Sequence, residues 1–102
     1  MTLAEFSLLV DAPPKWVLNA RATIGRAPAY SVAAAEQLAI VRVLNRDFAV
    51  PLPRAWRLAG ESLSTGTFGG PVRFIGSDGT VALEIDVTRI RSAISLTLRP
   101  AK

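Results

Sequence analysis

One segment, residues 32–45, constrains the fold more than any other part of the chain. Written as a helix, it is apolar almost all round, and polar side chains interrupt it chiefly at Glu36, Gln37 and Arg42. A helix of this kind must be covered on more than one side. Ser31 precedes it as a good N-cap residue, because its hydroxyl can accept a hydrogen bond from an N–H of the first turn. We therefore expect other segments to pack around this helix.

Two shorter helices are predicted before it, over residues 3–10 and 14–24. Apolar residues recur at helical spacing in both: Leu3, Phe6, Leu9 and Val10 in the first, and Val17, Ala20 and Ile24 in the second. Pro13 and Pro14 end the first helix and suit the first turn of the next one. Gly25 is a suitable residue to end the second helix. Two short helices joined by a tight turn have the helix-turn-helix arrangement.

A fourth helix is predicted over residues 53–63, followed by a loop or linker over 64–71. Beyond it the apolar period changes to two, because Val81, Leu83 and Ile85 alternate after a Gly/Asp turn, which predicts a β-hairpin from residue 72 to 86. Residues 87–98 fit both a helical stripe and an alternating strand. We favour a short helix with an extended end. The fold class is thus α+β, mostly α, with four short helices followed by a β-hairpin and a short helix or strand.

Composition limits the chemistry that the chain can perform. The 102 residues include no cysteine and no histidine, so disulfides, thiolate metal sites and the commonest catalytic bases are missing. Asp78, Glu84 and Asp86 form one acidic cluster, but turn formation and helix capping explain them. We expect no enzyme activity, no cofactor and no metal. The chain starts without a basic leader and has no apolar run of membrane length, which predicts a cytoplasmic protein that binds no membrane.

The formal net charge is +4, and the excess of basic residues is moderate. Most of this excess lies in the first sixty residues, so any surface that contacts phosphate is expected there. Four arginines of this part could form a phosphate-facing strip, although solubilising charge explains them equally well: Arg42, Arg46, Arg54 and Arg57.

Several motifs resemble the MerR-like, or excisionase-like, winged helix-turn-helix family. Its Arg-x-Tyr-Ser wing is similar to the segment that ends in Tyr30-Ser31. Its A-x-x-L-x-x-I-R-x-L helix is similar to Ala35, Leu38, Val41-Arg42 and Leu44, and its P-L-x-x-A-x-x-L segment to Pro51-Leu52, Ala55 and Leu58. The family's turn glycine corresponds to Asp11. This resemblance implies a winged helix-turn-helix domain over residues 1–63 that binds double-stranded DNA.

The resemblance also implies which residues contact DNA. The second helix would be the recognition helix, and the wing would touch the DNA backbone. The expected DNA-binding residues are Lys15, Trp16, Asn19, Arg21, Arg26 and Tyr30. The alternative for the four residues of the second helix, Lys15 to Arg21, is an ordinary solvated helix face with Trp16 against the core. The alternative for the wing is an arginine stacked on Tyr30 at the base of a loop.

Residues 72–102 are expected to bind a second copy of the chain or another protein, because a hairpin of two strands is marginal in water by itself. The expected interface residues are Val81, Leu83, Ile85, Ile90 and Ile94. With neither a long coiled coil nor an effector domain, the chain resembles a small repressor, or the antitoxin of a toxin–antitoxin pair with a cognate toxin as a possible partner. The alternatives are a protein-interaction module that does not bind DNA, and an architectural DNA-binding protein of the excisionase type.

Overall fold

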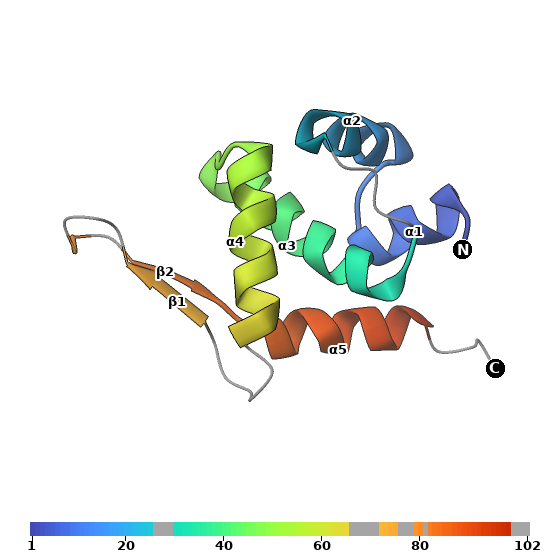
Figure 1. Ribbon diagram of the computed structural model, residues 1–102. Coiled ribbons are helices and arrows are strands. Elements are labelled where there is room, and N and C mark those ends of the chain that lie inside the picture. Colours follow the sequence, from blue (N-terminus) through green and yellow to red (C-terminus); the bar gives the residue numbers. More distant parts are fainter. Residues whose placement is uncertain (26–29, 66–71, 76–78, 81, 99–102) are drawn as a thin grey trace.

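The computed structural model describes residues 1–25, 30–65, 72–75, 79–80 and 82–98 (Figure 1). The elements follow one another as α1 (Leu3–Val10), α2 (Pro14–Ile24), α3 (Val32–Phe48), α4 (Leu52–Thr65), β1 (Val72–Ile75), β2 (Ala82–Ile85) and α5 (Val87–Leu98). The predicted α+β class with mostly helical content is confirmed. Both α1 and α2 have the bounds that the sequence predicts.

Local hydrogen bonds explain where α1 begins and ends. The Thr2 hydroxyl accepts a hydrogen bond from the Glu5 backbone N–H at 3.2 Å, and the Glu5 carboxylate accepts one from the Thr2 backbone N–H at 3.2 Å. This reciprocal pair is a capping box. At the other end Asp11 adopts the left-handed conformation, with φ 59°. Because Asp reaches this region more readily than most residues, it takes the place of a turn glycine.

The helix α3 is the centre of the core, and it contacts α1, α4 and α5. Its hydroxyl cap is present, since Ser31 Oγ accepts a hydrogen bond from the Ala34 N–H at 3.2 Å. The helix continues to Phe48, three residues beyond the predicted end. The buried apolar residues of α3 are Ala34, Ala35, Leu38, Ile40, Val41 and Leu44. The predicted covering of this helix on several sides is confirmed.

A second tight turn joins α3 to α4. Ala49 ends α3 in the left-handed conformation, with φ 54°, and the Val50 N–H donates to the Leu44 carbonyl at 3.1 Å. The Asn45 side-chain amide donates to the Val50 carbonyl at 3.0 Å. The α4 helix then begins one residue before the predicted Pro53. It ends at Thr65, so it takes up the first two residues of the predicted linker.

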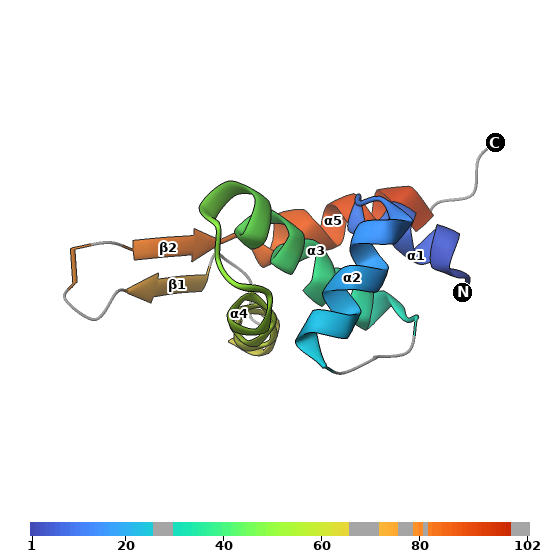
Figure 2. The same ribbon diagram turned by 90° about the horizontal axis from the view of Figure 1, so that it is seen from above.

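The strands β1 and β2 form an antiparallel hairpin that projects from the helical body in both views (Figures 1 and 2). Its register pairs Val72 with Ile85 and Phe74 with Leu83. Val72 and Ile85 are buried, whereas the exposed fraction of Ile75, on the opposite face, is 67%. The predicted hairpin is therefore confirmed over its strands, while Val81 and most of the predicted turn lie outside the described residues.

Residues 87–98 are helical throughout, so the predicted extended end was wrong. Asp86 caps this helix, because its carboxylate accepts a hydrogen bond from the Arg89 N–H at 3.0 Å. The α5 helix packs on α1 and α3, and Arg91 Nε donates to Glu36 Oε2 of α3 at 2.8 Å. In a strand, Leu96 and Leu98 would lie on the same face as the buried Ile94. Both are exposed in the structure.

Packing of α5 changes the interpretation of residues 72–102. Val72, Ile85, Val87 and Ile94 belong to the same apolar core as the residues of α1 to α4. The described part of the predicted C-terminal segment therefore completes the helical body. Ile85 and Ile94, predicted to lie at an interface with a partner, are 6% and 3% exposed. Both residues therefore belong to the core of this chain, and their predicted role at an interface is untested.

Candidate nucleic-acid interface

The α2 helix lies on one side of the molecule and α5 on the other, with α1 and α3 between them (Figure 1). Val17 and Ala20 of α2 are buried, and its opposite face carries exposed Lys15 and Asn19. The tight turn at Asp11 and the Pro13 cap set the direction of this helix relative to α1. An ammonium group and an amide on an exposed helix face can meet a phosphate and a base edge respectively.

Trp16, the third residue of the expected recognition helix, is half-buried. The guanidinium carbon of Arg42 lies 4.9 Å from the centre of the Trp16 ring. A cation over an aromatic face is an attractive arrangement. This contact links α2 to α3, and it uses the charge of Arg42 within the fold.

Arg21 and Tyr30 also contact each other. The Arg21 guanidinium carbon lies 4.3 Å from the centre of the Tyr30 ring, and that ring is tilted against Phe6 of α1 with 5.1 Å between centres. An arginine does lie over Tyr30, but it is Arg21 of α2 and not Arg26, the arginine that the sequence alternative placed there. Arg26, the other expected wing residue, lies outside the described residues.

The α4 helix lies against α2 and adds two exposed cations, Arg54 and Arg57. Sequence reasoning placed these in one strip with Arg42 and Arg46. The structure separates Arg57 from Arg42 and Arg46, because Arg42 and Arg46 line a hollow beside α1 and α5, whereas Arg57 lines another beside β1. Arg46 instead pairs with Asp47 at 2.9 Å, and this hydrogen bond lowers the pKa of the Asp47 carboxyl.

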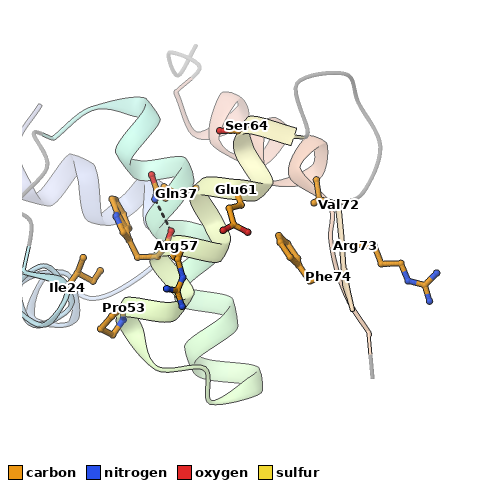
Figure 3. A pocket seen from close by; sticks show the side chains of 11 residues that line it. Ile24, Gln37, Pro53, Arg57, Glu61, Ser64, Val72, Arg73 and Phe74 are labelled. Carbon is orange, nitrogen blue, oxygen red and sulfur yellow. Dashed lines mark hydrogen bonds between the residues drawn. The ribbon is translucent and has the colours of Figure 1, made fainter. Parts of the chain in front are cut away.

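The hollow between α4 and β1 has a volume of about 780 Å³ (Figure 3). Phe74 points from β1 toward α4, where Glu61 lies, and Arg73 points away from α4. The side-chain amide of Gln37 donates to the Trp56 carbonyl at 2.9 Å and ties the base of α4 to α3. The charged residues that line this hollow are Arg57 and Glu61 of α4 and Arg73 of β1, one more cation than acid.

Among the residues that the structure describes, no group of three or more acidic side chains comes together where it could hold a metal ion. None of the described helices has both the length and the apolar character needed to cross a membrane. Comparisons with protein families, with characterised proteins and with solved structures find no match to this chain.

Proposed function

We propose that the protein is a sequence-specific regulator of transcription that binds double-stranded DNA, in the manner of a small repressor or an antitoxin. The observation that supports this most is the exposed face of α2, held by a tight turn on α1, with Lys15 and Asn19 free of the core. The second helix of a helix-turn-helix enters the major groove, and residues near its start contact the bases. In this proposal Asn19 reads a base edge and Lys15 binds phosphate.

The neighbouring helix supports the same surface. Arg54 and Arg57 of α4 are exposed, and α4 contacts α2. Cations beside a recognition helix add phosphate contacts, which position the protein on the duplex and make its affinity depend on salt. Trp16, Arg21 and Tyr30 have a different role in this proposal: they hold α2 in place through contacts with α1 and α3.

Selection from a pool of random DNA duplexes, followed by anisotropy titration of the enriched sequence at several salt concentrations, tests the proposal. We expect one enriched sequence and a steep loss of affinity with salt. Asn19→Ala should relax the preference at one base pair by about 1–3 kcal/mol, and Lys15→Ala should lower the salt slope by about one. No enrichment, together with no binding at about 50 mM salt, would refute DNA binding.

A matched control is Arg73→Ala. Arg73 is also an exposed cation, but it points away from α4 on the far side of the hairpin. Its removal changes the net charge as much as Lys15→Ala does. The salt slope should therefore stay at the wild-type value in Arg73→Ala. An equal fall in both variants would mean that general charge, and not the α2 face, sets the affinity.

A second candidate function is a protein-interaction module that does not bind DNA. It is supported by the contacts of Trp16, Arg21 and Tyr30, because these three expected DNA contacts are engaged within the chain. The duplex selection separates the two functions: a folded protein that enriches no sequence favours the interaction module.

A further inference from the structure

The exposed face of α2 is mostly apolar beyond its first turn. Helical spacing brings its exposed residues to one side of the helix, and we name this side the α2 outer face: Lys15, Leu18, Asn19, Ala22 and Thr23. Leu18, near its centre, is 49% exposed. The Thr23 hydroxyl donates to the Asn19 backbone carbonyl at 2.9 Å, so this donor is used within the helix. The Asn19 amide is thus a polar group with apolar side chains on both sides of it.

The arginine of α2 is held against the body of the protein. Arg21 is half-buried, and its guanidinium carbon lies 4.3 Å from the centre of the Tyr30 ring. An arginine that donates to O6 and N7 of guanine is the commonest specific contact between a protein and a base. Within α2 the remaining cation is Lys15, in the first turn. The middle of the α2 outer face therefore has no cation with which to read guanine.

An A·T pair matches the chemistry of this face. In the major groove adenine presents an acceptor, N7, beside an amino donor, and an asparagine amide, which has both a donor and an acceptor, binds the two together. Thymine presents its C5-methyl group, which apolar side chains contact. A G·C pair offers no methyl group to Leu18 or Ala22. Asn19 and its two apolar neighbours thus suit adenine and thymine.

We propose that the α2 outer face reads neighbouring A·T pairs, in which Asn19 binds an adenine and Leu18 and Ala22 contact thymine methyl groups. This inference rests on the proposed DNA binding and adds the bases that are recognised. Leu18 and Ala22 are about one helical turn apart, roughly 6 Å along the axis. Base pairs stack about 3.4 Å apart, so the two side chains reach about two neighbouring pairs.

The charges beside α2 favour DNA over a protein as the occupant of this face. Arg54 and Arg57 of the adjacent α4 are exposed, and neither forms an ion pair with an acid in the described part of the chain. Together with Lys15 they attract a polyanion. The duplex that these cations hold would bury Leu18 against the floor of the groove, where its exposed apolar atoms find the methyl groups.

Replacement of thymine by uracil tests the inference, because uracil pairs with adenine in the same way and lacks only the C5-methyl group. The probe is the duplex enriched by the selection described above, with each thymine in turn replaced by deoxyuridine. We expect an A·T pair at the position that Asn19→Ala relaxes and another beside it. Uracil at a contacted thymine should raise the Kd of the wild type about fourfold, the effect of one buried methyl group. Uracil at other positions should leave the Kd unchanged.

Leu18→Ala should abolish the uracil effect at one of these thymines, because the shortened side chain no longer reaches the methyl group. The control is Leu96→Ala: Leu96 is 63% exposed on α5, on the other side of the molecule, so this variant should keep the fourfold ratio. A G·C pair at the Asn19 position, no uracil effect at any thymine, or an unchanged effect in Leu18→Ala overturns this inference and leaves DNA binding intact. Failure to bind any duplex overturns the proposed function as well, and Leu18 would then favour a protein partner.

Discussion

The guanidinium of Arg21 covers the ring of Tyr30, with 4.3 Å between the guanidinium carbon and the ring centre. Arg21 lies on α2 and Tyr30 directly before the Ser31 cap of α3, so the pair joins two helices across a segment that contains the expected wing. The contact of the same ring with Phe6 adds α1. Residues that the family resemblance assigns to DNA binding thus fix the relative positions of three helices.

Replacement of Tyr30 by Ala should lower the free energy of unfolding by about 1–3 kcal/mol, because both the cation–π contact and the aromatic pair with Phe6 are lost. Tyr30→Phe keeps the ring and should cost far less. Urea denaturation of both variants measures the difference. Equal losses in the two would show that the hydroxyl, and not the ring, carries the stabilisation.

Ala49→Gly should stabilise the protein by about 0.5–1 kcal/mol. Ala49 has φ 54°, a left-handed conformation that costs a residue with a Cβ about 1–2 kcal/mol. Glycine avoids this cost, but part of the gain is lost because glycine gives the unfolded chain more conformational entropy. Gly25, with φ 80°, provides the reverse experiment: Gly25→Ala should destabilise the protein. Thermal unfolding of the two variants should move the midpoint in opposite directions, and a shift of the same sign would contradict the strain at Ala49.

Leu38→Ala should destabilise the protein by roughly 2–4 kcal/mol, since it opens a cavity in the core. Leu38 is 1% exposed on the central helix. The control is Leu96→Ala on α5, where the side chain is 63% exposed and the change should stay within about 0.5 kcal/mol. Chemical denaturation compares the two. A loss of stability of similar size in both variants would mean that Leu96 is buried against another surface in solution, which would contradict its exposure.

The capping box of α1 should weaken in acid. The pKa of Glu5 is lowered chiefly because the backbone N–H of Thr2 donates to its carboxylate. A lowered folded pKa contributes stability above the ordinary value, near ~4.3, and this contribution disappears as the pH falls through the folded pKa. The difference in unfolding free energy between wild type and Glu5→Gln should therefore be largest near neutral pH and shrink below about pH 4. A difference independent of pH would contradict the role of the carboxylate.

The sequence predicts those parts of the fold that depend on local interactions. The bounds of α1 and α2 follow from Asp11, the Pro13-Pro14 pair and Gly25, whose conformational preferences act within a few residues. Residues 87–98 were ambiguous because Ile94, Leu96 and Leu98 alternate. Their helical state depends on packing against α1 and α3, which neighbouring residues in the sequence do not encode.

The candidate site was harder to predict than the fold for the same reason. The exposure of Lys15 and Asn19 follows from helical periodicity alone. The partners of Trp16 and Arg21 cannot be predicted from this periodicity. Arg42, the partner of Trp16, is distant in sequence, and Tyr30, the partner of Arg21, lies outside α2. The exposed Phe48 lies beyond the predicted end of α3, so the sequence pattern did not place it on that helix.

The packing of α5 against α1 also affects how the protein is made. Translation proceeds at about 5–20 residues per second, so seconds pass between synthesis of Leu9 on α1 and of Ile94 on α5, both of which belong to one core. During this interval the nascent chain shows an incomplete apolar face to the ribosome surface and to chaperones. Completion of the fold must wait until α5 leaves the exit tunnel, so a chain that ended before α5 would leave uncovered the parts of α1 and α3 that contact this helix.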